Sequence, residues 1–233
     1  TPESVPARYM KGKALVQTGN YPEALDAFKK ALDLDPTYTE VYFQRGFAFL
    51  KLGRNTEAIE AFDANISRDA TNAPAHYYKG IALTKLRRYE DALTSFDQAL
   101  AHDPENALAH YHRGRALAEL GKHSDAVAAF ETTLSLKPQY HDAEMRRGVS
   151  LYQLGRFAKA IESLDSVLAA SPRNYHAFFQ KGLALAGLQR FIEALDAFDH
   201  TIEIDTSFTE GYFQKGLALM ALERYRDAIA PLI

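Results

Sequence analysis

The feature that most constrains this chain is a glycine that returns every 34 residues along nearly its whole length. The glycines of this series are Gly12, Gly46, Gly80, Gly114, Gly148, Gly182 and Gly216. A fixed period of this length is typical of arrays of helical repeats. In such arrays each repeat buries its apolar face against its neighbours, so the chain grows by stacking and has no single central core. The period therefore predicts an all-α solenoid.

Two more positions keep the same phase as the glycines. One is always alanine: Ala24, Ala58, Ala92, Ala126, Ala160, Ala194 and Ala228. Four residues later stands Phe or Leu: Phe28, Phe62, Phe96, Phe130, Leu164, Phe198 and Leu232. Small side chains allow two helix backbones to approach closely, and a bulky side chain can fill the space beside them. We therefore expect a close helix crossing in every unit.

The units are a single array with the boundaries 5–38, 39–72, 73–106, 107–140, 141–174, 175–208 and an incomplete 209–233. Each unit contains two amphipathic segments separated by a short polar turn. In the second unit the predicted helices run from about Glu40 to Leu52 and from about Glu57 to Arg68, because Gly53 is a helix stop signal. Prolines such as Pro36 end the second helix of a unit. The complete pattern predicts fourteen helices in hairpin pairs.

With these residues in place, the chain resembles the tetratricopeptide repeat (TPR) family. The first unit carries the family pattern as Gly12, Leu15, Ala24, Phe28, Ala31 and Pro36. Local departures include Asn65 and Ala70, where the second unit would have Ala and Pro. The resemblance implies a right-handed superhelix of helical hairpins, an α-solenoid, whose concave wall is lined by the first helix of each unit.

Helical periodicity indicates which residues of the first helices face this wall, since positions 2, 5, 6, 9, 12 and 13 of a unit share one arc. We call the side chains at the fifth, sixth and ninth positions the groove wall. The predicted peptide-binding residues are Tyr9, Phe43, Gln44, Phe47, Tyr77, Tyr78, Tyr111, His112, Arg115, Arg146, Phe179, Gln180, Phe213 and Gln214. The aromatic row at the fifth position has two interpretations, packing between units or contact with a ligand, and a ring can do both. Positive charge is expected in the N-terminal and middle parts of the wall, at Lys13, Lys51, Lys85, Arg115 and Arg146.

The seventh position is basic in every unit, although it lies on the side of the helix expected to be buried. The series is Lys11, Arg45, Lys79, Arg113, Arg147, Lys181 and Lys215. Acidic residues recur at the twenty-fifth position, on the second helix: Asp63, Asp97, Glu131, Asp165 and Asp199. We expect the stems of the basic residues to pack while their charged ends form a ladder of ion pairs with these carboxylates.

Composition and scattered polar residues exclude several function classes. The chain has 27 Lys and Arg against 30 Asp and Glu, with a net charge of −3, whereas nucleic-acid binding favours a basic surface. It has no Cys, which removes thiol nucleophiles and Cys-ligated metals but indicates no compartment. No apolar run reaches the roughly 20 residues of a membrane span. His110 and His112 would point to different sides of one helix. We therefore expect no nucleic acid, no membrane span, no catalytic residue, no metal and no cofactor.

The leading functional prediction is a non-catalytic scaffold that holds a peptide or helical segment of another protein, acidic in part, in the concave groove. The carboxylate clamp of chaperone-binding family members is missing, because Tyr9, Lys13, Gln44, Pro74 and Tyr78 stand at its positions. One alternative is the substrate-recruiting arm of a larger enzyme, such as a protein glycosyltransferase. Another is a self-assembling scaffold.

The last unit carries a separate expectation about association. It stops within its second helix, which contains Pro231 and an apolar face of Tyr225, Ile229 and Leu232. Terminal repeats normally carry a polar cap over such a face. We therefore expect the sequence to be part of a longer protein and its C-terminal face to associate with another molecule.

Overall fold

The computed structural model describes residues 4–229 and residue 231, and these residues form helices and turns without any β-strand. The helices are α1 (Val5–Gln17), α2 (Tyr21–Leu34), α3 (Thr39–Lys51), α4 (Asn55–Ile66), α5 (Ala73–Lys85), α6 (Tyr89–His102), α7 (Ala107–Glu119), α8 (His123–Leu136), α9 (His141–Gln153), α10 (Phe157–Ala170), α11 (Tyr175–Gly187), α12 (Phe191–Ile204), α13 (Thr209–Ala221) and α14 (Tyr225–Ala228). The bounds of α3 and α4 fall within two residues of those predicted. The predicted α-solenoid of helical hairpins is confirmed.

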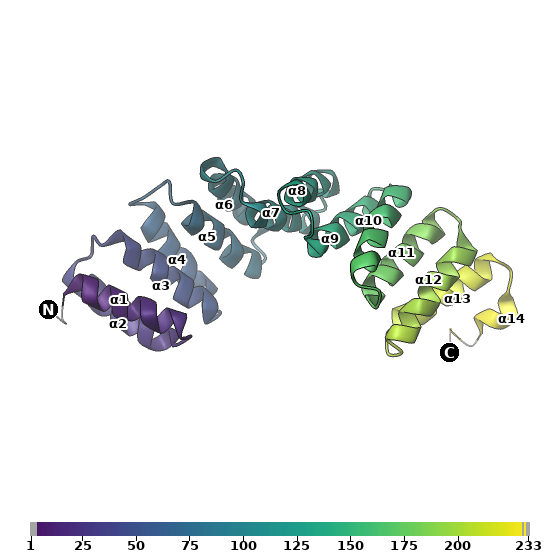
Figure 1. The fold of residues 1–233 in the computed structure, drawn as a ribbon, viewed down its shortest axis with the longest axis horizontal. Helices are drawn as coiled ribbons and strands as arrows, with labels where there is room; N and C mark the ends of the chain where they lie inside the picture. The colour runs from purple at the N-terminus through teal and green to yellow at the C-terminus, as the bar shows by residue number, and fades with distance from the viewer. Residues whose placement is uncertain (1–3, 230, 232–233) are drawn as a thin grey trace. The chain divides into compact units, whose positions relative to one another are not determined.

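The chain divides into two compact units, one up to Ala116 and one from Leu117 onward, and α7 contains the boundary. In the first unit α1 packs on α2, α3 on α4 and α5 on α6 as antiparallel hairpins (Figure 1). The second helix of each hairpin also packs on the first helix of the next, as α2 does on α3. In the second unit the same two kinds of contact join α8 through α14.

In four hairpins the core contains the predicted contact between the recurrent glycine and an aromatic ring, and in the α9–α10 hairpin Leu164 takes the place of the ring. Phe28, Phe62, Phe96 and Phe198 are completely buried, and each ring occupies the space beside the recurrent glycine of its own hairpin. The alanine four residues before each ring is also completely buried. A methyl side chain is the largest that fits there, because both helices contribute backbone atoms to the crossing.

Inside each hairpin the chain reverses through one residue of left-handed backbone conformation. Glycine takes this place in four turns, with φ between 69° and 80°, at Gly19, Gly53, Gly121 and Gly155. Glycine favours this conformation because it lacks a β-carbon. In three turns a residue with a side chain takes it, with φ of 59° to 60°: Arg87, Gln189 and Glu223. The turn geometry is therefore set by the hairpin packing and persists where glycine is absent.

Four of the five predicted rungs of the ion-pair ladder are present among the described residues, and each joins two successive hairpins. The rung predicted at Glu131 is absent there, because Arg147 donates to Ser163 instead. Lys79 Nζ lies 2.5 Å from Asp63 Oδ1, and Arg113 Nε donates to Asp97 Oδ1 over 2.6 Å. In the second unit Lys181 pairs with Asp165 at 2.6 Å and Lys215 with Asp199 at 2.5 Å. The side chains of these four cations are 26% to 32% exposed, so their stems pack while their ends reach water.

Two basic residues at the seventh position, Arg45 and Arg147, take no part in the ladder of ion pairs. Arg45 has Lys29 at the position where an acidic partner would stand, and its guanidinium lies 5.3 Å from the ring centre of Phe49. Arg147 Nε donates to Ser163 Oγ over 3.1 Å. Among the described residues neither arginine forms an ion pair with a carboxylate.

The second helix of the last hairpin is shorter than its counterparts. α14 ends at Ala228, three residues before Pro231. Proline lacks the amide hydrogen that a helix needs and its ring clashes with the carbonyl four residues earlier, so a helix cannot continue normally through it. The expected apolar face is exposed at Tyr225 (62%) and Ile229 (59%), while Leu232 lies outside the described residues.

Candidate functional site

The groove wall is carried by α1, α3, α5 and α7 in the first unit and by α9, α11 and α13 in the second. Most of its predicted residues are half-buried: Tyr9, Phe43, Gln44, Phe47, Tyr77, Tyr78, His112, Arg115, Arg146, Gln180 and Gln214. Tyr111 and Phe179 are buried, with 5% and 8% of their surface exposed. Phe213 is 47% exposed. Partial burial means that most of these side chains contribute both to packing and to the surface.

In the first unit the rings of the wall join successive hairpins. Phe43 and Tyr78 both contact the buried ring of Phe62, with ring centres 6.0 and 6.3 Å away. The next hairpin repeats the arrangement, since Tyr77 and His112 contact the ring of Phe96 at 6.2 and 6.1 Å. In both cases the recurrent phenylalanine of a hairpin packs between two rings of the wall. One ring, at the fifth position, belongs to the first helix of the same hairpin, and the other, at the sixth position, belongs to the first helix of the next.

This contact pattern decides part of the question that the sequence left open. Four rings at the fifth position, Tyr9, Phe43, Tyr77 and Phe179, each contact the buried phenylalanine of their own hairpin. Offset and edge-on aromatic contacts of this kind stabilise a core beyond simple burial. The packing interpretation therefore applies to these four rings, and a ligand there would meet only their remaining edges.

In the second unit the wall is less uniform. Phe179 contacts Phe198 at 6.1 Å and Phe208 at 5.0 Å, which explains its burial. Gln214 donates from Nε2 to Glu210 Oε1 over 2.9 Å on its own helix. An amide engaged in this way offers fewer hydrogen bonds to a peptide backbone than the sequence suggested.

Three basic side chains of the first unit lie over rings of the wall. Lys13 Nζ is 5.6 Å from the ring centre of Tyr9, and Lys51 Nζ is 5.1 Å from that of Phe47. The guanidinium of Arg115 is 5.8 Å from the ring centre of Tyr111. Cation–π contacts hold such side chains along the surface while their donors stay available.

A hollow of about 280 Å³ opens in the wall of the first unit, between Tyr9 and Phe43. Its other lining residues are polar: Thr39, Glu40, Asn65, Asp69 and Asn72. Burial, followed by the proximity of Tyr38 and Glu40, raises the pKa of the Tyr9 hydroxyl. The N-terminal part of the groove wall was expected to be basic. It also contains two carboxylates, because Glu40 and Asp69 line this hollow beside Tyr9 and Phe43.

Asn65 shapes this hollow. It replaces the alanine of the repeat pattern, is 1% exposed, and donates from Nδ2 to the Thr39 carbonyl over 3.0 Å. Its Oδ1 accepts a hydrogen bond of 2.9 Å from Asn72 Nδ2. Both ends of the buried amide are thus satisfied, as a buried polar group requires.

A second hollow, of about 430 Å³, lies in the wall of the second unit around Arg146. Met145 and Val149 form its apolar part, and Glu119, His123, Asp142 and Gln153 are among its polar lining residues. A cation flanked by carboxylates and an amide can bind a polar segment by charge and hydrogen bonding.

One contributor to the wall was missed in the sequence, the last position of each unit. Where it is aromatic it packs on the row, as Tyr38 does on Tyr9 at 5.4 Å. Where it is asparagine it caps the next helix, as Asn72 Oδ1 does by accepting from the Ala75 amide over 3.1 Å. The available signal was that the last position of each complete unit is either aromatic or asparagine.

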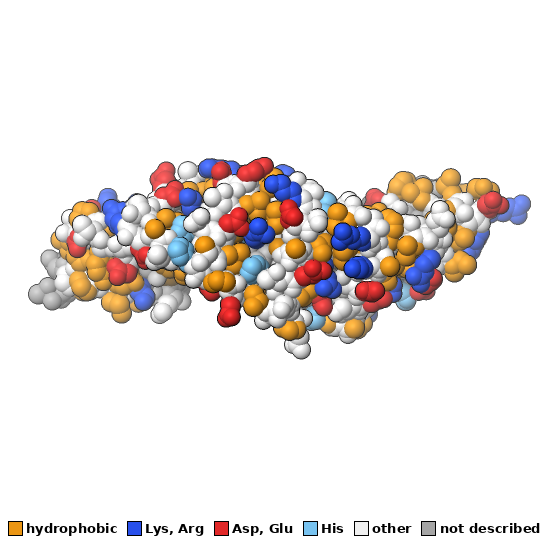
Figure 2. Space-filling view, turned by 90° about the horizontal axis from the view of Figure 1, so that it is seen from above, with side chains coloured by type: hydrophobic (Ala, Val, Ile, Leu, Met, Phe, Trp, Pro, Cys, Tyr) orange, Lys and Arg blue, Asp and Glu red, His pale blue; other side chains and the backbone are white. Residues whose placement is uncertain are grey.

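Other kinds of site find no support in the part of the chain that the structure describes. No group of three metal-ligating side chains occurs there, and no helix is long and apolar enough to cross a membrane. His76 Nε2 and His110 Nε2 each lie 3.0 Å from a loop carbonyl, of Ala70 and Pro104. Figure 2 shows acidic and basic side chains interspersed over one face, without a large patch of a single sign.

Comparison with known families agrees with the repeat pattern. A tetratricopeptide repeat model matches residues 77–141 and 145–207, which is more than half of the chain. A second tetratricopeptide repeat model matches residues 39–72, and a model described as TPR repeat matches residues 12–53. No curated protein sequence matches the chain.

Several solved structures share the fold. One described as the crystal structure of MamA protein is 25% identical, with a TM-score of 0.69, and the match covers 74% of this chain and 94% of that one. YrrB, described as a TPR protein with an unusual peptide-binding site, is 23% identical, with a TM-score of 0.74 and coverage of 85% and 99%. A tetratricopeptide repeat protein from Parabacteroides merdae is 16% identical, with a TM-score of 0.73 and coverage of 97% and 90%. The chain belongs to the tetratricopeptide repeat family, whose α-solenoids serve generally as protein-interaction scaffolds.

Proposed function

We propose that this protein is a non-catalytic scaffold that binds a peptide or helical segment of a partner protein along its groove wall. The observation that carries the proposal is the row of half-buried rings on α1, α3 and α5, with basic side chains held over Tyr9 and Phe47. Rings of this kind supply contact area at a small entropic cost, and the cations beside them supply charge.

The charges of the groove wall favour a partner segment that carries side chains of both signs. Lys13, Lys51, Arg115 and Arg146 favour acidic side chains, while the hollow beside Glu40 and Asp69 favours a basic or amide side chain. Complementary charges of this sort contribute more to specificity and association rate than to affinity. The partner segment is therefore expected to be acidic in part and to carry apolar residues between its charges.

The test begins with selection of short peptides from a displayed random library on the whole chain. Isotherms of the selected peptides are then measured on Phe47→Ala, Arg115→Glu and Arg146→Glu. Loss of an exposed ring edge should weaken binding about tenfold, and the two charge reversals should weaken acidic peptides selectively and reduce the salt dependence of binding.

A matched control is Lys29→Glu, because Lys29 is an exposed lysine on α2 and lies outside the groove wall. It should leave every isotherm unchanged. Peptides that bind equally well to Arg115→Glu, to Arg146→Glu and to the unaltered chain would contradict the proposal, as would equal losses in Lys29→Glu.

A second candidate function is self-association through the C-terminal end. Phe213, Leu217 and Met220 on α13 are 41% to 47% exposed, whereas Phe179, the counterpart of Phe213 on α11, is 8% exposed. Two copies could bury this apolar face against each other in a symmetrical pair. Light scattering over a range of concentrations tests it: Phe213→Gln should abolish dimers, and a monomer at every concentration would exclude them.

A further inference from the structure

An aromatic residue at the last position of a unit packs against the ring at the fifth position of the same unit. In the first unit Tyr38 packs edge-on against Tyr9, with ring centres 5.4 Å apart. In the sixth unit Phe208 packs against Phe179 at 5.0 Å, and Phe179 is only 8% exposed. In these two units the aromatic side chain of the last position therefore fills the space beside the fifth-position ring.

In the second unit this space is open. Its last position is Asn72 and the ring at its fifth position is Phe43. The asparagine has other partners, since its Oδ1 accepts from the Ala75 amide and its Nδ2 donates to Asn65 Oδ1 over 2.9 Å. The hollow of about 280 Å³ lies here, bounded by Phe43, Asn72 and the ring of Tyr9. Its size suits a single side chain, because pockets that enclose whole small molecules measure about 300–1,000 Å³.

The charged residues that line the hollow are both acidic. Glu40 lies on α3 and Asp69 lies in the loop after α4, and no basic side chain of the described residues joins them in the lining. The Asp69 carboxylate accepts hydrogen bonds at Oδ1 from the hydroxyl and the amide of Thr71, over 2.8 and 3.1 Å, and Oδ2 takes no part in these bonds. Within the described part of the chain neither Glu40 nor Asp69 forms an ion pair.

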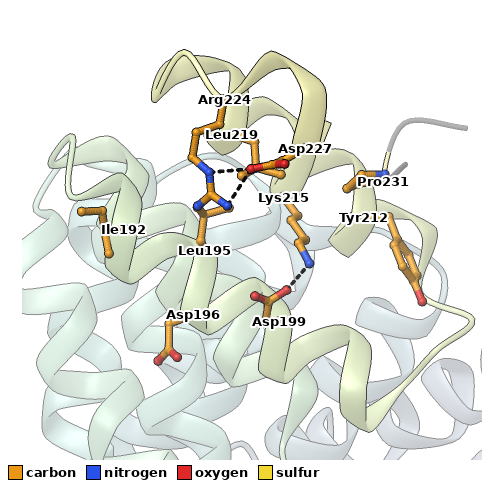
Figure 3. Close-up of a pocket in the computed structure, with 10 residues that line it drawn as sticks. All are labelled: Ile192, Leu195, Asp196, Asp199, Tyr212, Lys215, Leu219, Arg224, Asp227 and Pro231. Atoms are coloured by element: carbon orange, nitrogen blue, oxygen red, sulfur yellow. Dashed lines mark hydrogen bonds and ion pairs between the residues drawn. The ribbon is translucent and has the colours of Figure 1, made fainter. Parts of the chain in front are cut away.

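Figure 3 shows how two carboxylates of the second unit are neutralised. Lys215 reaches from α13 to Asp199 of α12, with charged atoms 2.5 Å apart. In the same view Arg224 binds Asp227 at 2.7 Å. The hollow lacks a cation of this kind among the described residues, so a positive group that enters it meets two carboxylates that are not neutralised.

The rings give a second reason to expect a cation in the hollow. A guanidinium or ammonium group is attracted to the face of an aromatic ring within about 6 Å of its centre, and this chain already holds Arg68 over Tyr42 at 4.3 Å. Lys13 lies 5.6 Å from the centre of Tyr9 but does not line the hollow. Arginine and lysine have aliphatic stems that can pack on Tyr9 and Phe43 while their charged ends reach a carboxylate. An apolar side chain would remove water from the carboxylates without replacing its hydrogen bonds.

From this geometry we propose that the hollow is a pocket for one cationic side chain, arginine or lysine, of the partner segment. The proposal rests on the proposed function, because the hollow opens on the groove wall between the fifth-position rings of two successive units, where that segment is expected to lie. Asn72 leaves the room, and Glu40 and Asp69 select the charge. A neutral amide of similar size is expected to bind less well.

The test uses the peptides selected on the whole chain from the displayed library. Each arginine of a peptide is replaced in turn by citrulline and each lysine by norleucine, which removes the charge and keeps most of the shape. One such replacement is expected to weaken binding to the unaltered chain about tenfold or more. Exchanging arginine and lysine at that place then shows which of the two cations the pocket prefers.

The first protein variant removes the negative charge of the hollow. Glu40→Gln with Asp69→Asn keeps a side-chain oxygen that can accept from Thr71. On this double variant the neutral replacement in the peptide should cost less than about twofold, because the lost charge no longer has a partner. The matched control is Asp33→Asn with Glu60→Gln, at exposed carboxylates of α2 and α4 outside the hollow. On the control the same replacement should still cost about tenfold.

A second variant closes the hollow and keeps both carboxylates. Asn65→Ala with Asn72→Tyr gives the second unit the pair that the first unit has in Ala31 and Tyr38. The introduced ring should cover Phe43, so peptides with the cationic residue should bind no better than their neutral counterparts. Thermal melts check that each variant is folded.

Selected peptides that contain no arginine or lysine, or that tolerate every loss of positive charge while still responding to Phe47→Ala, would overturn the pocket and leave the proposed function standing. An undiminished cost on Glu40→Gln with Asp69→Asn, or a vanished cost on the control, would also overturn it. A selection that returns no peptide would contradict the proposed function and the pocket together.

Discussion

The ring of Phe96 fills the space that a side chain at Gly80 would need, because a β-carbon at Gly80 would lie 2.5 Å from Cε1 of that ring. Phe96 is completely buried and Tyr77 and His112 contact it, so the ring cannot move aside. The contact between glycine and ring therefore fixes the distance between α5 and α6.

Replacing this glycine should test the contact directly. Gly80→Ala is expected to lower the free energy of unfolding by about 1–3 kcal/mol through overpacking. Gly148→Ala is the matched control, since a β-carbon there would lie 3.1 Å from Cγ of Leu164 and the better helix propensity of alanine, about 1 kcal/mol, offsets the strain. Chemical denaturation measures both. Equal losses in the two variants would contradict the role of the ring.

The recurrent alanine should be equally sensitive to size. Ala126 is completely buried in α8, and Ala126→Leu should reduce stability by about 1–3 kcal/mol. Ala128 is exposed on the same helix, so Ala128→Leu should change stability by less than about 0.5 kcal/mol. The comparison is made by thermal melts. A neutral Ala126→Leu would mean that the register of the repeat is wrong.

Completing the ladder of ion pairs should stabilise the first unit. Lys29 stands where the acidic partner of Arg45 is expected, so Lys29→Asp replaces a repulsion by an attraction. The gain should reach about 1 kcal/mol at low salt and shrink as salt is added, since exposed pairs are weak and screened. Lys29→Ala separates the two effects, because it removes the repulsion only. If Lys29→Asp were no more stable than Lys29→Ala, the pair would not form.

Acid should weaken the turns that follow α2 and α12. Hydrogen bonds from the Thr37 hydroxyl and amide lower the pKa of Asp35 below its usual 3.8, and those from Ser207 lower the pKa of Asp205. A lowered pKa means that the charged carboxylate stabilises the fold above the unfolded-state pKa and that this stabilisation is lost as the pH falls through the folded-state pKa.

We therefore expect Asp35→Asn with Asp205→Asn to make stability less dependent on pH in the acidic range, where both carboxylates of the unaltered protein take up protons. Denaturation at a series of acidic pH values measures the slope, and NMR titration of the two carboxyl groups gives their pKa values directly. An unchanged slope, together with carboxyl pKa values near 3.8, would refute this assignment.

The sequence was sufficient for the repeat, because the glycine, alanine and phenylalanine of each unit meet within one hairpin. Contacts between hairpins were harder to predict. The repeat pattern showed that a basic and an acidic position recur in every unit. Whether Lys79 reaches Asp63 of the preceding hairpin, however, depends on how the hairpins stack. The 34-residue period alone does not determine that stacking geometry.

The same reason explains the outcome at the groove wall. Helical periodicity placed Tyr111 and Phe179 on the wall, yet both are buried. For Phe179 the cause is visible, since Phe208 approaches it from the loop before the next helix. Likewise, the hollow beside Tyr9 depends on Asn65 and Asp69, which lie at the end of α4 and after it, away from the first helices. A pattern within one helix cannot reveal residues that reach the surface from another.

The two arginines outside the ladder have a mechanical consequence. In a solenoid each hairpin contacts mainly its neighbours, so resistance to separation is a local property of every junction. Among the described residues, the α2–α3 and α8–α9 junctions lack the ion pair that Asp63 or Asp165 forms elsewhere: Lys29 stands at the acidic position of α2, and at α8–α9 Arg147 donates to Ser163 and does not pair with Glu131. When the chain is pulled from its ends, these junctions are expected to part before the α4–α5 and α10–α11 junctions, so that extension proceeds in steps whose order is determined by charge.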